Sequence, residues 1–128
     1  MLTERWRAHP ENAAAGLWTT ADDLGRFLAA LTASLSGVNE TLLPADWARR
    51  MVTGVKPADR GVQVGHGLFI NDEGTEFWHG GVNVGYNAFI AGTLDGRFAV
   101  AVVTNADPGG IAVTTEIVDT IAVALGWR

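Results

Sequence analysis

Cysteine is absent from the 128-residue chain, which excludes disulfide bonds, thiol nucleophiles and cysteine-ligated zinc. Serine and lysine are scarce as well, because the chain holds only Ser34, Ser36 and Lys56. No apolar run reaches the roughly 18 residues of a membrane helix, and the first residues lack the apolar core of a signal peptide. We therefore expect no membrane span, and the compartment stays unknown.

Positive charge is also sparse. Nine basic residues stand against 14 acidic ones, for a net charge of −5, so nucleic acid is not an expected partner. Hydrophobic residues make up 48% of the chain, which is too many for a disordered protein. The three histidines, His9, His66 and His79, lack the four-residue spacing of a helical metal site. We expect neither a metal nor another cofactor.

The spacing of apolar residues changes once along the chain, from a helical period to a period of two. A helical period follows Thr20, which resembles an N-cap, and ends near Gly37. A second helix begins at Pro44 and runs to Gly54, and residues 13–18 form a packed, extended lead-in before both. After Gly61 the period is two, which predicts strands.

Four strands and a final helix are expected in the second half. The strands cover residues 62–70, 75–79, 86–93 and 97–104, with a break at Gly80–Gly81 and an Asp95–Gly96 hairpin before the last one. The final helix places Ile111, Thr114, Val118, Ile121 and Leu125 on one face. The fold class is therefore α+β: an antiparallel sheet of three to four strands with two N-terminal helices and a C-terminal helix packed on it, in a single domain over residues 1–128.

His79 is the strongest candidate for a functional residue. It ends a predicted strand, and the two glycines after it let a ligand or another backbone approach closely. The backbone amide of Val82 would then point into a cleft. The alternative is a structural histidine in a glycine-rich bend. Ser34 and Ser36 fit the polar end of a helix better than they fit a nucleophile.

Several segments, in order, resemble the C-terminal part of the serine β-lactamase and penicillin-binding protein superfamily, in its class C, DD-peptidase and esterase-like branch. No single motif is specific, but the resemblance covers essentially the whole chain. The segments are Ala14–Leu28, Leu42–Met51, Gly65–Leu68, Trp78–Phe89, Leu94–Arg97 and Val102–Asn105.

The resemblance implies a site of three elements: a Ser-x-x-Lys helix, a Tyr-x-Asn element and a Lys/His-Thr/Gly-Gly strand. Only the third is present, as His79-Gly80-Gly81. By resemblance, His79 polarises the substrate, and Gly80 and Gly81 keep the strand close to it. The Val82 amide is one oxyanion-hole donor, and the amide of the missing serine is the other.

The resemblance therefore implies a C-terminal fragment, about the last third of a serine hydrolase that performs acyl transfer on a small amide, ester or β-lactam. The chain alone is predicted to be inactive. Two alternatives remain: half of a split hydrolase completed by a partner chain, and a non-enzymatic binding module. Acylation that a partner chain restores would favour the split hydrolase. Ligand binding that depends on His79 and occurs without turnover would favour the binding module.

The last strand, Arg97–Thr104, has an expected partner surface. In the family, two N-terminal strands lie beside the final strand of this sheet, and this chain lacks them. The strand would then form a sheet edge with no charge between Phe98 and Thr104. Such an edge pairs readily, so we expect self-association or pairing with a complementing N-terminal segment.

Overall fold

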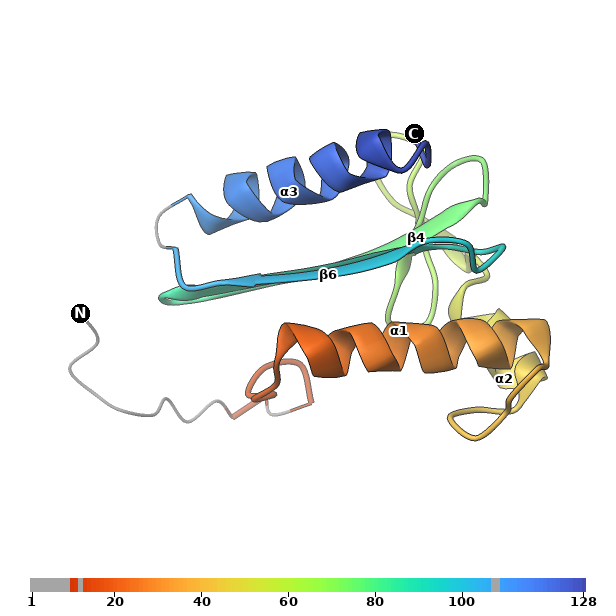
Figure 1. Cartoon of the computed structure of the whole chain (residues 1–128). Coiled ribbons are helices and arrows are strands. Elements are labelled where there is room, and N and C mark those ends of the chain that lie inside the picture. The colour runs from red at the N-terminus through yellow and green to blue at the C-terminus, as the bar shows by residue number, and fades with distance from the viewer. Residues whose placement is uncertain (1–9, 12, 107–108) are drawn as a thin grey trace.

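The protein forms three layers, with one sheet between helices on its two faces (Figure 1). The computed structural model describes residues 10–11, 13–106 and 109–128. Helix α3 covers one face, while α1 covers the other with α2 beside it. The helices are α1 (Ala21–Ser36), α2 (Ala45–Met51) and α3 (Gly110–Ala124). The strands are β1 (Lys56–Pro57), β2 (Gln63–Val64), β3 (Phe69–Ile70), β4 (Glu76–Asn83), β5 (Tyr86–Thr93) and β6 (Ala99–Thr104).

The sheet is an antiparallel meander, because its spatial order, β1 to β6, is the order of the chain. This confirms the α+β class, but the strand count of three to four was too low. The predicted strand over 62–70 is two short strands, β2 and β3. Gly67 has a φ of +84°, and the Gly65 amide bonds to the Leu68 carbonyl at 2.8 Å, so the chain reverses there.

Helix α1 begins and ends as predicted. The Thr20 hydroxyl accepts a hydrogen bond from the Asp23 amide at 3.1 Å, and Gly37 closes the helix with a φ of +71°. The second helix ends at Met51, earlier than the predicted Gly54. In the described residues, no helix is both long enough and apolar enough to cross a membrane.

Two apolar clusters fill the spaces on either side of the sheet. On the α1 face, Leu28 and Leu31 pack with Phe77, and all three side chains are fully buried. On the α3 face, Val118 packs with Ala91 and Val102. Because β6 touches both clusters, its apolar character on both faces is explained.

The last helix turns only part of the predicted face to the sheet: Thr114 and Val118 are buried and Ile121 is partly buried. It buries Gly110, Thr114, Val118 and Ala122, whereas Ile111 and Leu125 are 60% and 56% exposed. Small residues at a four-residue spacing therefore form the contact face, and the larger apolar residues remain on the surface. The final strand lies at the sheet edge as predicted, although its regular part begins at Ala99.

Strand β4 corrects a further prediction. It runs without interruption through Gly80 and Gly81, where a break was expected, and all eight residues pair with β5. Backbone bonds hold this pairing, and they need no side chain. The two glycines therefore lie inside a strand.

Candidate functional site: the open edge of β4

The direction of the β4 peptide groups follows from two hydrogen bonds at its start. The Leu94 amide donates to the Thr75 carbonyl at 2.9 Å on the β5 side, and the Asn71 amide donates to the Glu76 carbonyl at 3.1 Å on the other side. Antiparallel ladders alternate residue by residue. Peptide groups of odd-numbered residues therefore face β5, and those of even-numbered residues face away from it.

Only the first part of this outward side is covered. Strand β3 pairs with Phe77 and Trp78 and goes no further along β4. Beyond that point, no strand of the described residues pairs with the outward N–H and C=O groups of Gly80 and Val82. The predicted donor, the Val82 amide, thus lies on an open backbone edge, next to an exposed valine side chain.

His79 stands where the open edge begins. Its backbone pairs with Ile90, and its exposed ring stacks on Phe69 with centroids 6.0 Å apart and planes 21° from parallel. Phe69 also stacks on Trp78, with centroids 6.1 Å apart. The imidazole is therefore held by an aromatic neighbour from β3, yet it remains accessible. The arrangement brings His79 next to Gly80 and Val82 on one strand end.

The two glycines differ in their surroundings. A Cβ on Gly80 would lie 3.2 Å from Cδ2 of Phe89, so a packed ring favours glycine there. A Cβ on Gly81 would meet nothing within 4 Å. Internal packing therefore explains Gly80 but not Gly81, whose open side faces a cavity.

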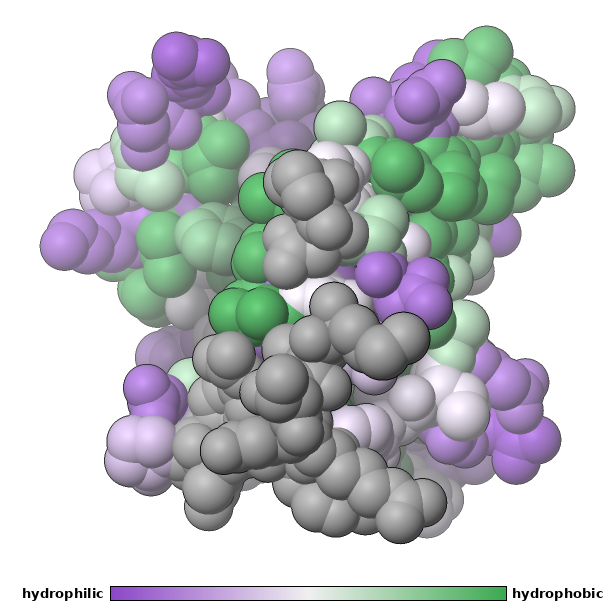
Figure 2. All heavy atoms as spheres, turned by 90° about the vertical axis from the view of Figure 1, so that its left-hand side faces the viewer, coloured by the Kyte–Doolittle hydropathy of each residue, from purple (hydrophilic) through white to green (hydrophobic). Residues whose placement is uncertain are grey.

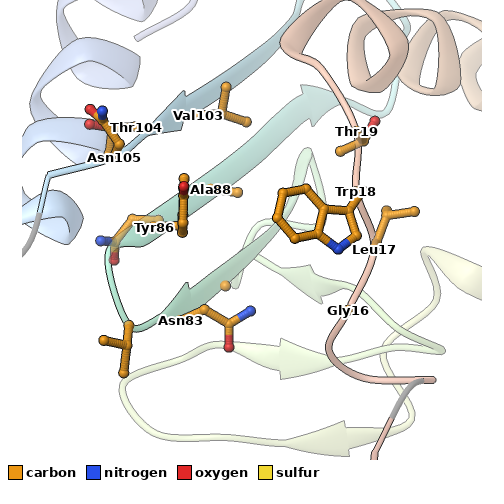
Figure 3. Close-up of a pocket in the computed structure, with 13 residues that line it drawn as sticks. Gly16, Leu17, Trp18, Thr19, Asn83, Tyr86, Ala88, Val103, Thr104 and Asn105 are labelled. Atoms are coloured by element: carbon orange, nitrogen blue, oxygen red, sulfur yellow. The ribbon is translucent and has the colours of Figure 1, made fainter. Parts of the chain in front are cut away.

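That cavity lies on the α1 face of the sheet, beyond the first turn of α1, and has a volume of about 620 Å³. Its floor is Gly81, Ala88 and Val103, which stand opposite one another across β4, β5 and β6. Figure 3 shows Leu17 and Trp18 across the gap from the end of the β4–β5 hairpin, with the indole directed toward the sheet. None of the 13 described residues that line it carries a charged side chain.

The sequence did not predict that Leu17 and Trp18 form a wall of this cavity. Residues 13–18 were expected to be packed, but the Leu17 and Trp18 side chains are 79% and 67% exposed. Small apolar residues around them suggested a packed lead-in, and no local pattern shows that the facing surface is open. Tyr86 and Asn83, at the tip of the β4–β5 hairpin, also line the cavity and were not predicted.

The two serines lie far from the open edge. Ser34 is fully buried and donates to the Asn39 carbonyl at 3.2 Å, and the Ser36 hydroxyl donates to the Ala33 carbonyl at 3.0 Å. Helix α1 starts beside the cavity at Thr20, and a rise of 1.5 Å per residue puts Ser34 about 21 Å further along its axis. Both serines are polar residues at the C-terminal end of α1, as predicted, and their hydroxyl groups bond to nearby backbone carbonyls.

Metal-binding side chains do not cluster in the part of the chain that the structure describes, where no group of three His, Cys, Asp or Glu residues could hold an ion. The described residues offer two backbone amides and one imidazole at the edge, next to a cavity that they line with uncharged side chains. This combination suits hydrogen bonding to a carbonyl group.

Comparisons with known proteins bear on the fold. A family model described as Beta-lactamase matches residues 2–123. Among solved structures, the chain is similar to the octameric penicillin-binding protein homologue from Pyrococcus abyssi, with a TM-score of 0.65 and 22% sequence identity. This similarity covers 81% of the chain and 24% of the archaeal protein, so the chain spans about a quarter of that length. None of the curated proteins compared with the chain matches it.

Proposed function

Because the chain belongs to the β-lactamase family, we propose that the open edge of β4 is one wall of an acyl-transfer site in a serine hydrolase. The substrate is a small molecule with an amide, ester or β-lactam carbonyl. The observation that carries the proposal is the outward Val82 amide on an edge that no described strand covers, three residues from an accessible His79.

Each residue has a role in this proposal. A serine attacks the carbonyl carbon, the carbonyl oxygen becomes an oxyanion, and the Val82 N–H donates to it. His79 polarises the substrate and takes part in moving the proton from the serine to the leaving group. Gly81, with open space on its cavity side, lets the substrate lie against the strand. The product of this step is an acyl-enzyme, which water or another acceptor resolves.

The serine comes from another segment in this proposal, so the chain alone is catalytically incomplete. Neither Ser34 nor Ser36 precedes a lysine in a Ser-x-x-Lys pattern, and both lie at the far end of α1. The only tyrosine, Tyr86, is followed by Asn87-Ala88 and gives no Tyr-x-Asn element. The small share of the archaeal homologue covered by the chain agrees with a partial enzyme.

The experiment measures acyl adducts by intact mass after incubation with a penicillin-like or activated ester probe. The chain alone should form none. Added to a segment that carries Ser-x-x-Lys and Tyr-x-Asn, it should restore an adduct on that segment's serine. An adduct on the isolated chain contradicts the incomplete-site proposal, and ligand binding without any restored acylation would favour a binding module.

Substitutions at Val82 test the oxyanion donor directly. Val82→Pro removes the outward N–H and no ladder bond to β5, so the strand should remain paired. We expect acylation by the completed enzyme to fall about 100- to 1,000-fold. Val82→Ala keeps the amide and should keep the rate, while His79→Ala should lose acylation with the fold intact. Equal rates for the proline and alanine variants would remove Val82 from the site.

The β6 edge is the proposed attachment surface for the complementing segment or for a second copy. Thr93 donates its amide to the Phe98 carbonyl at 3.0 Å, so by alternation the peptide groups of Ala99, Ala101 and Val103 point away from β5. Helix α3 adds exposed apolar side chains, and Figure 2 shows hydrophobic residues gathered at the level of α3. The archaeal homologue is itself an octamer.

Light scattering tests this surface. Ala101→Pro removes an outward N–H from β6 without removing a bond to β5. We expect the chain to be larger than a monomer at high micromolar concentration, and the Ala101→Pro variant to shift toward the monomer. A strictly monomeric native chain contradicts self-association.

A further inference from the structure

Phe69, on the short strand β3, stacks on the histidine at the open edge of β4. We propose that Phe69 is a positioning residue for His79, because its ring fixes the plane in which the imidazole lies. The inference rests on the proposed function, since it concerns the acylation step in which His79 takes part. In this role Phe69 touches no substrate atom and acts only through the histidine.

Phe69 stacks on two other aromatic rings. Its ring centroid is 6.0 Å from that of His79, with the planes 21° from parallel, and 6.1 Å from that of Trp78, with the planes 26° from parallel. Both separations lie in the range of attractive aromatic pairs, about 4.5–7 Å. Trp78 also packs against the apolar cluster on the α3 face. The three rings therefore connect the core of the protein to the exposed imidazole.

Core packing does not explain an aromatic residue at position 69. The Phe69 side chain is half-buried, and neither apolar cluster of the described residues includes it. Ile70, the other residue of β3, supplies the buried side chain of this strand. The backbone of Phe69 is held on both sides, opposite Val64 in β2 and Trp78 in β4. Its ring therefore projects from a fixed backbone position, and the two stacks are what distinguish it from an aliphatic residue.

The His79 imidazole needs such a neighbour to keep one orientation. Its side chain is exposed, and no hydrogen bond or ion pair from another described residue reaches it. The last side-chain torsion of a histidine has broad energy wells, so an unstacked ring samples many planes. Stacking on Phe69 narrows this choice, because the two rings must stay close to parallel.

Proton transfer makes this orientation important. A general acid or base acts when its nitrogen lies within about 2.6–3.2 Å of the atom that gives or takes the proton. A misplacement of about 1 Å can cost on the order of 100-fold in rate. Loss of the Phe69 ring should therefore slow the acylation step. Binding of the substrate carbonyl at the Val82 amide should not change, because that donor belongs to the backbone of β4.

The test uses the full chain completed by a segment that carries Ser-x-x-Lys and Tyr-x-Asn, with p-nitrophenyl acetate as the probe. The serine takes the acetyl group and p-nitrophenolate leaves, so the initial release of p-nitrophenolate measures acylation. Phe69→Leu removes the ring, and we expect the maximal acylation rate to fall about tenfold. Phe69→Tyr keeps the ring and should stay within about twofold of the native rate. The ester concentration at half-maximal rate should change less than about twofold in both variants.

Two further measurements separate positioning from a general loss of packing. Phe27→Leu is the matched control, because Phe27 is also half-buried but packs against the cluster on the α1 face and does not stack on His79. It should keep the native acylation rate. Carbon-13 and proton spectra of the chain alone report on the imidazole directly. The ring current of Phe69 shifts the His79 ring signals, and this shift should be lost in Phe69→Leu and kept in Phe69→Tyr.

The outcomes distinguish this inference from the proposed function. A completed native enzyme that forms no acyl adduct contradicts the proposed function, and with it any role of Phe69 in acylation. Acylation at the native rate in Phe69→Leu overturns the positioning role and leaves the proposed function intact. Equal losses in Phe69→Leu and Phe27→Leu overturn it too, as does a tyrosine variant that is as slow as the leucine variant. Imidazole signals that do not respond to Phe69→Leu overturn it whatever the rates are.

Discussion

Both halves of β4 pair with β5, but they differ in what covers their other edge and in how deeply their side chains are buried. The first half, Glu76 to Trp78, is covered by β3 on its other edge and holds the fully buried Phe77. The second half, His79 to Asn83, is exposed and has no strand beside it among the described residues. Stability is therefore concentrated in one half, and unpaired hydrogen-bonding groups in the other.

The sharpest test of this difference is a pair of truncations. Phe77→Ala should lower the free energy of unfolding by about 3–5 kcal/mol, because a large buried ring leaves a cavity. Val82→Ala, on the exposed half, should change it by less than about 0.5 kcal/mol. Urea denaturation measures both values, and similar costs for the two variants would contradict the division of the strand.

The ion pair at the start of β4 gives a smaller effect. Arg128 donates to both carboxylate oxygens of Glu76, at 2.7 Å for the shortest contact, and also contacts Asp119. The hydrogen bond to Glu76 raises the pKa of Arg128 above its ordinary value. Glu76→Gln should cost about 1 kcal/mol in chemical denaturation. Asp119→Asn, at a more exposed carboxylate, should cost less, and the reverse order would contradict this assignment.

The adjacent glycines test the packing of the exposed half. Gly81→Ala should leave the free energy of unfolding within about 0.5 kcal/mol, since the new methyl group meets open space. Gly80→Ala should be less stable than that variant by about 0.5–1 kcal/mol, because its methyl group presses on Phe89. Thermal denaturation of the two variants under the same conditions measures this difference in stability. Equal stabilities would mean that the Phe89 ring moves freely.

A weak acid-dependent effect is expected at Asp95, near the covered end of the sheet. Hydrogen bonds from the Thr93 hydroxyl and the Arg97 amide lower the pKa of Asp95 in the turn after β5. Its folded pKa is below the unfolded one, so its contribution is present above the unfolded pKa and is lost as the pH falls through the folded value. Amide signals near Asp95 should shift between about pH 5 and pH 2, while Gly80 and Val82 should not follow. Asp95→Asn should abolish that shift.

The sequence predicted those features that depend on local chemistry. The Thr20 cap, the Gly37 stop and the hairpin at Asp95–Gly96 each rest on a few neighbouring residues, and all three are present. Gly80 and Gly81 misled the prediction of β4, because backbone pairing with the next strand, β5, outweighs the weak strand preference of glycine.

The candidate site, too, could be predicted only in part. The His79-Gly80-Gly81 sequence is visible as a motif, and its place on an open edge follows only from where β3 stops pairing. The exposure of Trp18 could not be read from its surroundings in the sequence, since it depends on what faces it across space. Tertiary geometry decides which small and apolar residues meet around the cavity.

The order of the strands has a consequence for folding. Each strand of the meander pairs with the next one in the chain, so the sheet assembles from successive hairpins and requires no pairing between distant strands. Helix α1 closes a long loop when it packs on β6, and Arg128 closes another when it bonds to Glu76. Low contact order favours rapid folding. The sheet can therefore form early, before any additional strand arrives at β6, and a separately made segment would meet a template that is already in place.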